Sequence, residues 1–367
     1  MKTTSPVRRA AAAALALGLL TAVSACSTKT ANDTGGGGGD TSAAKIAFLM
    51  PDQASTRYEQ HDRPGFEAEL KKQCPDCQSL YNNADNDAAK QQQQFNAAIS
   101  QGAKAIVIDP VDSTAAASLV GAAQAQGVKV IAYDRPIPDA KPDFYVSYDN
   151  EEIGKTIAQS LVDDLKAKGV APGSGGLLEV NGSPTDAAAG LIKKGIHSAL
   201  DSSGYPILAE YDTPGWDPSK AQQWVAGQVS RFGGQIQGVV AANDGTGGGA
   251  IAAFKAAGVN PLPPVTGNDA TDAGLQLIIA GDQYNTISKP SETVGAAAAK
   301  AAVALIKGEQ PEATDEVFGA KTALFTPTLV TRDSIKADIF DTKIADAATI
   351  CTDRYASGCQ ELGITTS

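Results

Sequence analysis

The chain has 367 residues, of which 41 are acidic and 30 basic, and its net charge is −11. An acidic balance argues against nucleic-acid binding, which needs a basic face, and against binding to an anionic membrane through charge. The chain is too long for one domain of average size and fits two.

The first 25 residues have the layout of a cleaved secretion signal. Residues 2–9 contain three basic side chains, and the apolar run Ala10–Leu20 that follows is too short to span a bilayer, which needs about 20 apolar residues. The next residues, Val23-Ser24-Ala25-Cys26, resemble the cleavage site of a bacterial lipoprotein. We therefore expect a signal peptide over 1–25, a lipid on Cys26, and a change in net charge from −11 to −14 when the three basic residues are removed. An ordinary signal with a chance cysteine and a single membrane-spanning anchor are the alternatives.

Residues 26–44 are polar and low in complexity, with five consecutive glycines at 35–39. Such a segment cannot bury apolar surface, so we expect a flexible tether between the lipid and a folded body. The body then runs from residue 45 to residue 367.

The four cysteines of the body form two close pairs in the sequence. Disulfides persist outside the cytoplasm, so we predict bonds Cys74–Cys77 and Cys351–Cys359. The Cys-Pro-Asp-Cys spacing of the first pair also occurs in redox motifs, but those usually open a helix. Here the pair stands between a helical pattern and a strand, which favours a structural clip.

Short apolar runs alternate with longer amphipathic stretches along the body. We predict strands at Ile46–Met50, Gln78–Tyr81, Ala105–Ile108, Lys129–Tyr133, Gly176–Val180, Ile207–Tyr211, Gln237–Ala241 and Val265–Thr266. We predict helices at Gly65–Lys72, Asp87–Gln101, Thr114–Gln126, Asn150–Lys168, Asp186–Ser202 and Pro218–Phe232. Continuous apolar strands separated by helices indicate an α/β protein with parallel sheets covered on both faces.

Polar residues recur directly after the predicted strands. They are Asp52, Asp134-Arg135, Asn181, Trp216-Asp217, Asn243-Asp244 and Asn268-Asp269. In open α/β sheets, ligands bind beyond the carboxyl ends of the strands, so these residues form a candidate site. One such residue alone would reflect ordinary turn chemistry.

The candidate residues offer little for catalysis. Ser183 lacks the Gly-x-Ser-x-Gly frame, and the acids have amide and basic neighbours that would keep them ionised, which does not suit a glycosidase. The glycine-rich run 243–249 matches no nucleotide-binding fingerprint, and we interpret it as a strand-to-helix turn. His61 and His197 are the only histidines and lack metal-ligand spacing, so we expect no metal site and no cofactor. Carboxylates, amides and a guanidinium suit sugar hydroxyls, and aromatic rings suit the apolar face of a pyranose.

The body also resembles a known family over about Lys45–Phe340: the monosaccharide-binding proteins of ABC transporters, in the branch with xylose-binding and glucose/galactose-binding members. Eight short motifs in order carry the resemblance. They are Arg57-Tyr58 with Asp62-Arg63, Ala132-Tyr133-Asp134-Arg135, Ser147-Tyr148-Asp149-Asn150-Glu151, Asn181-Gly182-Ser183-Pro184, Gly215-Trp216-Asp217, Ala242-Asn243-Asp244, Thr266-Gly267-Asn268-Asp269 and Ser288-Lys289-Pro290.

The resemblance implies the periplasmic binding protein type I fold, with two Rossmann-like lobes, three crossovers and a ligand cleft between the lobes. Crossovers near 148–149, 288–289 and 325–327 imply one lobe of 45–148 plus 289–325 and another of 149–288 plus 326–367. The implied ligand-binding residues are Arg57, Tyr58, Asp134, Arg135, Asn181, Asp217, Asn243, Asp269 and Lys289. We add Trp216 to this site, with core packing as the alternative. Tyr58 replaces a frequent tryptophan and Asn268 a common glutamine, which leaves the identity of the sugar open among xylose, glucose, galactose and related pentoses or hexoses.

We therefore expect a sugar-binding protein that is not an enzyme. Its expected partners are a monosaccharide, the permease subunits of an ABC importer, and the membrane through the lipid on Cys26; we expect no nucleic acid and a monomer. A repressor of the same fold would carry a helix-turn-helix head where this chain has a secretion signal. A sugar or signal-molecule sensor coupled to a receptor remains an open alternative.

Overall fold

The structure is a computed structural model that describes residues 43–365. The predicted signal peptide, the predicted lipidation site Cys26 and nearly all of the predicted tether lie outside these residues. Between residues 43 and 365, no helix has both the length and the apolar character needed to cross a membrane.

The first of three sheets has seven strands, in the order β10-β11-β5-β4-β3-β1-β2. The strands are β1 (Lys45–Met50), β2 (Gln78–Asn83), β3 (Ala103–Ile108), β4 (Lys129–Tyr133), β5 (Phe144–Tyr148), β10 (Asp315–Val317) and β11 (Ala320–Phe325). All neighbouring strands are parallel except β10 and β11, which form an antiparallel hairpin.

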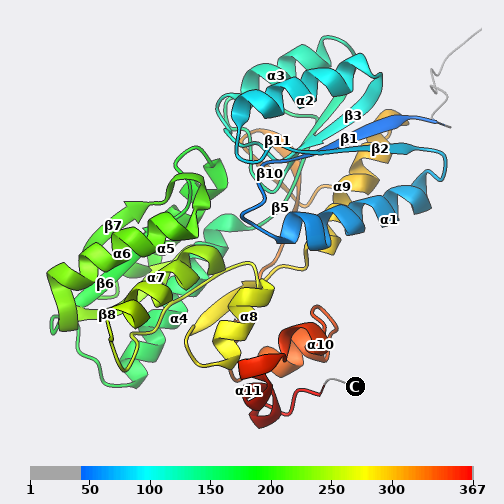
Figure 1. The fold of residues 1–367 in the computed structure, drawn as a ribbon. Helices are drawn as coiled ribbons and strands as arrows, with labels where there is room; N and C mark the ends of the chain where they lie inside the picture. Colours follow the sequence, from blue (N-terminus) through cyan, green and yellow to red (C-terminus); the bar gives the residue numbers. More distant parts are fainter. Residues whose placement is uncertain (1–42, 366–367) are drawn as a thin grey trace, which may run out of the picture. The chain divides into compact units, whose positions relative to one another are not determined.

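Helices cover both faces of this sheet (Figure 1). One face carries a π-helical turn (Tyr58–Asp62), α1 (Arg63–Gln73) and α9 (Ser291–Ile306), and the other carries α2 (Ala88–Ser100) and α3 (Ala116–Gln124). Side chains of β1 alternate between the two layers: Phe48 packs in the core with α1 and α9, and Leu49 packs in the core with α2 and α3. Burial on both faces explains why β1 reads as a continuous apolar run.

The second sheet is parallel and has the strand order β7-β6-β8. Its strands are β6 (Gly176–Asn181), β7 (Ile207–Asp212) and β8 (Ile236–Ala241). The helices are α4 (Asn150–Ala167) and α5 (Ala187–Leu200) on one face, and α6 (Pro218–Phe232) and α7 (Asp244–Ala256) on the other. A third, antiparallel pair joins β9 (Asn285–Ser288) to β12 (Thr328–Thr331). Near this pair, α8 (Asp272–Ile279), α10 (Ala347–Ile350) and α11 (Ala356–Glu361) share a separate small core.

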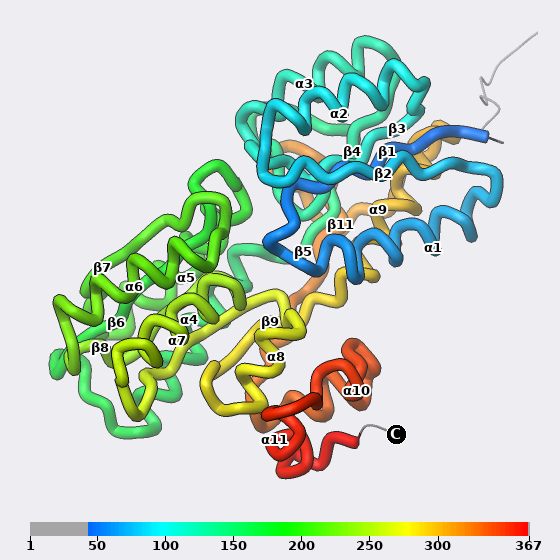
Figure 2. Tube along the Cα trace, viewed as in Figure 1, coloured from blue at the N-terminus to red at the C-terminus, as the bar shows by residue number. Residues whose placement is uncertain are grey.

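The chain passes between the two large sheets three times (Figure 2). It leaves the seven-stranded sheet after β5 to enter α4, returns after β9 into α9, and leaves again from β11 to β12. Two α/β layers, each built on a sheet of mainly parallel strands and joined by three crossovers, are the architecture that the resemblance implied.

Both predicted disulfides are present, Cys74–Cys77 after α1 and Cys351–Cys359 between α10 and α11. The interpretation of residues 243–249 as a turn is wrong beyond Asn243, because α7 begins at Asp244. Asn243 caps this helix, and its side chain accepts a hydrogen bond from the Thr246 amide. The glycines permit close packing: a Cβ on Gly249 would lie 2.4 Å from the Pro218 carbonyl oxygen.

Candidate ligand-binding site

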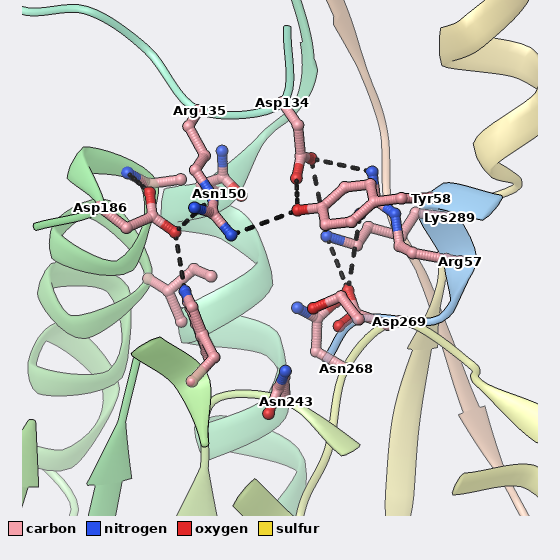
Figure 3. A pocket seen from close by; sticks show the side chains of 14 residues that line it. Arg57, Tyr58, Asp134, Arg135, Asn150, Asp186, Asn243, Asn268, Asp269 and Lys289 are labelled. Carbon is pink, nitrogen blue, oxygen red and sulfur yellow. Dashed lines mark hydrogen bonds and ion pairs between the residues drawn. The ribbon is translucent and has the colours of Figure 1, made fainter. Parts of the chain in front are cut away.

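A pocket lies where loops from the carboxyl ends of strands in different sheets converge (Figure 3). Its cavity volume is about 30 Å³, which is room for about two water molecules. The lining residues are Ser55, Arg57, Tyr58, Asp134, Arg135, Asn150, Asp186, Ala188, Ile192, Trp216, Asn243, Asn268, Asp269 and Lys289. Eight of the ten residues predicted from the sequence are therefore brought together.

Arg57 is held in the pocket wall by a two-point ion pair. Its Nε and a terminal nitrogen donate to the two carboxylate oxygens of Asp62 at 3.1 and 2.9 Å. The same guanidinium lies 3.3 Å from Asp134 and 3.7 Å from Asp269. Asp62 itself is fully buried and also accepts a hydrogen bond from the Tyr133 hydroxyl. Asp62 was left out of the predicted site, and here it orients a pocket residue from behind.

Asp134 is an ionised acceptor at the end of β4. Burial opposes its ionisation, but the positive charges of Arg57, Lys289 and Arg135 outweigh this effect and lower the pKa to about 2. Its backbone has a φ of 55°, a conformation that is unusual for a residue with a side chain. The hydroxyls of Tyr145 and Ser147 donate to the Asp134 carbonyl at 2.7 and 2.9 Å and hold the backbone in this conformation.

The side chain of Arg135 is only 4 % exposed, and it contacts three carboxylates. It donates to Asp52 at 2.9 Å and to the Pro110 carbonyl at 3.1 Å, and its Nε lies 3.1 Å from Asp186 and 3.4 Å from Asp109. Burial raises the pKa of both Asp109 and Asp186, and Arg135 acts in the opposite direction. A planar guanidinium with five donors can serve several acceptors at once, which a lysine cannot do.

The opposite wall contains Lys289 and Asp269. The Lys289 ammonium lies 2.9 Å from Asp269 and 4.0 Å from Asp134. Asn268 and Asn243 lie beside this pair (Figure 3). The side-chain nitrogen of Asn268 donates to the Ala242 carbonyl at 3.3 Å. The side-chain oxygen of Asn268 is buried and has no hydrogen-bond partner among the described residues.

Trp216 lines the pocket and is also packed against its neighbours. Its indole nitrogen donates to Asp186 at 2.9 Å, and only 7 % of the residue is exposed. A Cβ on Gly182 would lie 2.1 Å from the indole ring, so glycine is required beneath it. Asp186 is in turn the N-cap of α5, which brings Ala188 and Ile192 to the pocket as apolar lining.

Two predicted residues are not among the lining residues of the pocket. Asn181 donates to Glu210 at 3.5 Å, on the side of β6 that faces α5. Asp217 is the N-cap of α6, where it accepts hydrogen bonds from the amide and the hydroxyl of Ser219 at 2.8 and 2.7 Å.

Five lining residues were missed by sequence reasoning: Ser55, Asn150, Asp186, Ala188 and Ile192. Asn268, which also lines the pocket, was noted after its predicted strand but was not among the ten predicted ligand-binding residues. Asn150 stands inside one of the motifs, and Asp186 begins a predicted helix, so each had a local signal. Ala188 and Ile192 had none, because small and aliphatic residues on a helix read as core.

Two segments beside the pocket bond directly to each other. The Ser113 amide donates to the Thr185 carbonyl at 3.0 Å, and the Ala187 amide donates to the Ser113 hydroxyl at 3.1 Å. The Thr185 hydroxyl donates to the Val111 carbonyl at 3.2 Å. Residues 111–113 follow β3 of the seven-stranded sheet, and residues 185–187 follow β6 of the second sheet. These bonds, with the Arg135–Asp186 pair, join the two α/β layers next to the pocket.

The pocket combines three buried cations, Arg57, Arg135 and Lys289, with six carboxylates that pair with them. An excess of carboxylates disfavours an anionic ligand, and alternating donors and acceptors favour a ligand rich in hydroxyl groups. Fold and site together define a ligand-binding protein with two α/β layers around a polar pocket.

The chain belongs to the family described as periplasmic binding protein domain, which matches residues 46–310. It is 34 % identical over 272 residues to the D-xylose-binding periplasmic protein of Escherichia coli, covering 72 % of this chain and 79 % of that protein. It is 32 % identical to the xylitol-binding protein of Mycolicibacterium smegmatis, over 65 % of this chain and 66 % of that one.

Solved structures share the fold. A carbohydrate transporter solute-binding protein from Chloroflexus aurantiacus, in complex with D-glucose, aligns with a TM-score of 0.74 and 28 % identity over 84 % of this chain and 98 % of that one. A solute-binding protein from Clostridium phytofermentans with bound β-D-glucose aligns with a TM-score of 0.77 and 24 % identity over 83 % of this chain and 99 % of that one.

Proposed function

We propose that the chain is the extracytoplasmic solute-binding component of an ABC importer and binds one neutral monosaccharide in the pocket described above. The observation that carries this proposal is the convergence of Asp134, Arg135, Asp269 and Lys289 on one small cavity. The relatives support it, because those named above are called xylose-binding and xylitol-binding proteins. The family consists of binding proteins rather than enzymes.

Each polar group has a place in sugar recognition. Asp134 and Asp269 accept hydrogen bonds from hydroxyl groups, and Arg57, Arg135 and Lys289 donate to hydroxyl and ring oxygens. The Trp216 ring, with Ala188 and Ile192, covers the apolar face of the ring of the sugar. When a sugar binds, its hydroxyl groups replace some of the ion pairs that the charged residues make with one another in this structure.

The cavity of about 30 Å³ is smaller than a monosaccharide, so the walls must separate to admit one. We assign the movement to two lobes, 45–148 plus 289–325 and 149–288 plus 326–367. The three crossovers between the sheets support this division, because a few residues at such passages can absorb a hinge rotation.

A thermal-shift panel of D-xylose, D-glucose and D-galactose tests the function, followed by calorimetric titration of the best ligand. Asp134→Ala should weaken binding by about 2–5 kcal/mol, because it removes a charged acceptor and also takes one buried carboxylate away from Arg57 and Lys289. Asp217→Ala is the matched control: its carboxylate caps α6, so affinity should be unchanged while stability falls by about 1 kcal/mol. No stabilisation by any neutral sugar, or equal affinity in Asp134→Ala, would remove the proposed site.

We also assign the predicted signal peptide 1–25 and the lipid on Cys26 to this function, because a tethered protein stays near its permease. The chain then acts as a membrane-anchored monomer. Cys26→Ala should be released into the medium or remain unprocessed. Normal processing with full membrane retention would contradict the anchor.

A receptor-coupled sugar sensor is the second candidate, because one relative, 30 % identical over 297 residues and from Rhizobium radiobacter, is called a multiple sugar-binding periplasmic receptor. Reconstitution of the chain with the permease and ATPase of a candidate ABC importer distinguishes import from sensing. Sugar-dependent stimulation of ATP hydrolysis supports import, and its absence with intact sugar binding supports a sensor.

A further inference from the structure

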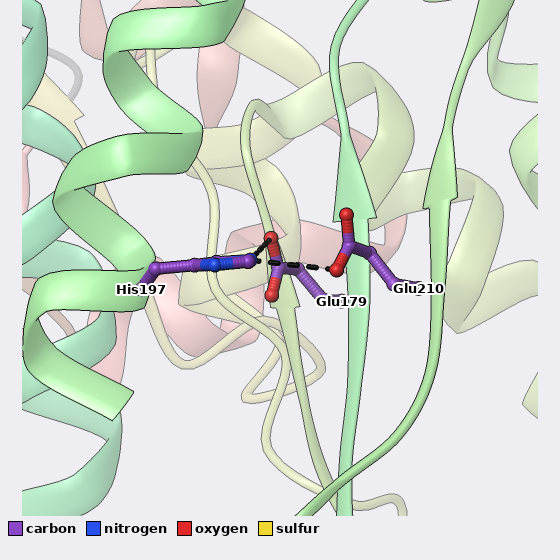
Figure 4. Close-up of side chains that lie close together, drawn as sticks. All are labelled: Glu179, His197 and Glu210. Atoms are coloured by element: carbon purple, nitrogen blue, oxygen red, sulfur yellow. Dashed lines mark hydrogen bonds and ion pairs between the residues drawn. The ribbon is translucent and has the colours of Figure 1, made fainter. Parts of the chain in front are cut away.

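Three side chains outside the pocket, Glu179, His197 and Glu210, converge on one point (Figure 4). The His197 Nε2 lies 3.1 Å from one Glu179 oxygen and 3.4 Å from one Glu210 oxygen. One ligand-type atom from each residue lies within 4.8 Å of the other two.

Regular secondary structure places these groups. Glu179 in β6 and Glu210 in β7 are register partners in parallel strands, so their side chains lie side by side on one face of the sheet. Helix α5 packs on that face and carries His197. Strand β7 is the edge of the sheet, and about a third of the His197 and Glu210 side chains is exposed, so the cluster is open to solvent.

The main evidence for a bound ion at this cluster comes from Glu179. It is completely buried, and its second carboxylate oxygen accepts no hydrogen bond of normal geometry from any described residue. Burial raises its pKa, although Asn181, His197 and Lys193 act in the opposite direction. A buried carboxylate without full compensation is costly, and either a proton or a cation relieves that cost.

The surrounding charges add to this need. Lys193 pairs with Glu210 and with Asp212, and it is the only lysine or arginine that contacts the cluster within the described residues. The carboxylates of Glu179, Glu210 and Asp212 and the ammonium of Lys193 together carry two negative charges when His197 is neutral. A divalent cation neutralises the group.

We propose that Glu179, His197 and Glu210 form a binding site for a divalent transition-metal ion of the zinc type. Zinc takes imidazole nitrogen and carboxylate oxygen at about 2.0–2.2 Å, which places neighbouring ligand atoms of a tetrahedron about 3.4 Å apart. The two distances from His197 Nε2 match this spacing. Two carboxylates and one histidine leave a fourth position for water. The bound ion joins β6, β7 and α5, so it stabilises the second sheet without touching the sugar pocket.

The sequence alone predicted no metal site, because the spacing of the two histidines fits no ligand motif. The site arises from the pairing of two strands that are 31 positions apart, and a spacing rule cannot detect such a pairing.

Titration of ZnCl₂ into the purified, chelator-treated chain, followed by calorimetry, tests the site. We expect one zinc ion per chain and a rise in the melting temperature. His197→Ala and Glu210→Gln should each weaken zinc binding at least about tenfold. Lys193→Gln should strengthen it several-fold, because the ammonium competes for Glu210.

His61→Ala is the matched control, since His61 is the only other histidine and its nearest acidic partner is Glu292, at 3.3 Å. Its zinc affinity should equal that of the unmodified chain. Circular dichroism establishes that each variant is folded, and sugar titration is a separate readout, so failure of the metal site does not bear on the proposed function. Absence of one-to-one zinc binding, or equal zinc affinity in His197→Ala and Glu210→Gln, would overturn the proposal.

Discussion

At the scale of single residues, charge is concentrated around Asp134. This carboxylate lies between Arg57 and Lys289, and its backbone conformation is fixed by two hydroxyl groups from β5. Such preorganisation means that the acceptor is already ionised and oriented when a ligand arrives. It also makes the stability of the fold depend on the protonation of one residue.

The pH dependence of unfolding should reveal this dependence. The pKa of Asp134 is about 2 in the folded chain, below the value of about 3.9 for an unfolded aspartate. The ionised group therefore contributes stability above about pH 4, and this contribution, on the order of 2–3 kcal/mol, is lost progressively as the pH falls from about 4 through 2. Denaturant unfolding from pH 5 to pH 2 should show the difference between the unmodified chain and Asp134→Asn shrinking. A difference in unfolding free energy between the two chains that stays constant from pH 5 to pH 2 would contradict this prediction.

Arg135 should not tolerate replacement by lysine. Arg135→Lys keeps the charge but loses the fork that reaches Asp52, Asp186 and the Pro110 carbonyl, so both sugar affinity and unfolding free energy should fall. Arg63→Lys is the control, because Arg63 is 42 % exposed at its side chain and pairs with Glu67 on the surface. Titration and chemical denaturation should show a clear loss for Arg135→Lys and almost none for Arg63→Lys.

At the scale of elements, α4 and α5 approach each other through glycine. A Cβ on Gly154 would lie 1.9 Å from the Ile192 carbonyl oxygen, whereas a Cβ on Gly190 of α5 would meet nothing within 4 Å. Gly154→Ala should therefore lower the unfolding free energy by about 1–3 kcal/mol or more. Gly190→Ala should raise it by about 0.5–1 kcal/mol, because alanine is the better helix former. Equal effects in denaturant unfolding would show that the helices can move apart freely.

The elements with clear periodicity could be predicted from the sequence, and β1, β4, α4 and α6 lie close to their expected bounds. Strands β9 to β12 could not, because each has three to six residues and gains its stability from pairing with distant segments. Helix α9 was also missed, since its alanine-rich sequence is buried nearly all round and shows little contrast between faces.

The site followed the rule that ligands bind at the carboxyl ends of strands, but two details depended on boundaries. The predicted strand ended at Val180, whereas β6 includes Asn181, whose side chain therefore follows the alternation of Glu179 and faces α5. Asp217 directly precedes a predicted helix that begins at proline, so its capping role had a local signal that the resemblance overrode.

At the scale of the whole molecule, ligand binding should change the separation of the proposed lobes. A saturating sugar should close the cleft and lower the radius of gyration, and it should stabilise the fold by about 2.7 kcal/mol at one hundred times its dissociation constant. Small-angle scattering and thermal melting measure the two effects. Identical scattering curves with and without a ligand that raises the melting temperature would contradict the closure.

The bonds between residues 111–113 and 185–187 join the two proposed lobes and use none of the lining residues of the pocket, so we expect them to form on closure whichever sugar is bound. Each kilocalorie per mole by which they favour closure raises the affinity for every ligand by about fivefold. Ser113→Ala should therefore raise the dissociation constants of all bound sugars by the same factor, and titration of two sugars should show their ratio unchanged. These bonds thus set the sugar concentration at which the protein begins to fill, whereas the residues that line the pocket determine which sugar is preferred.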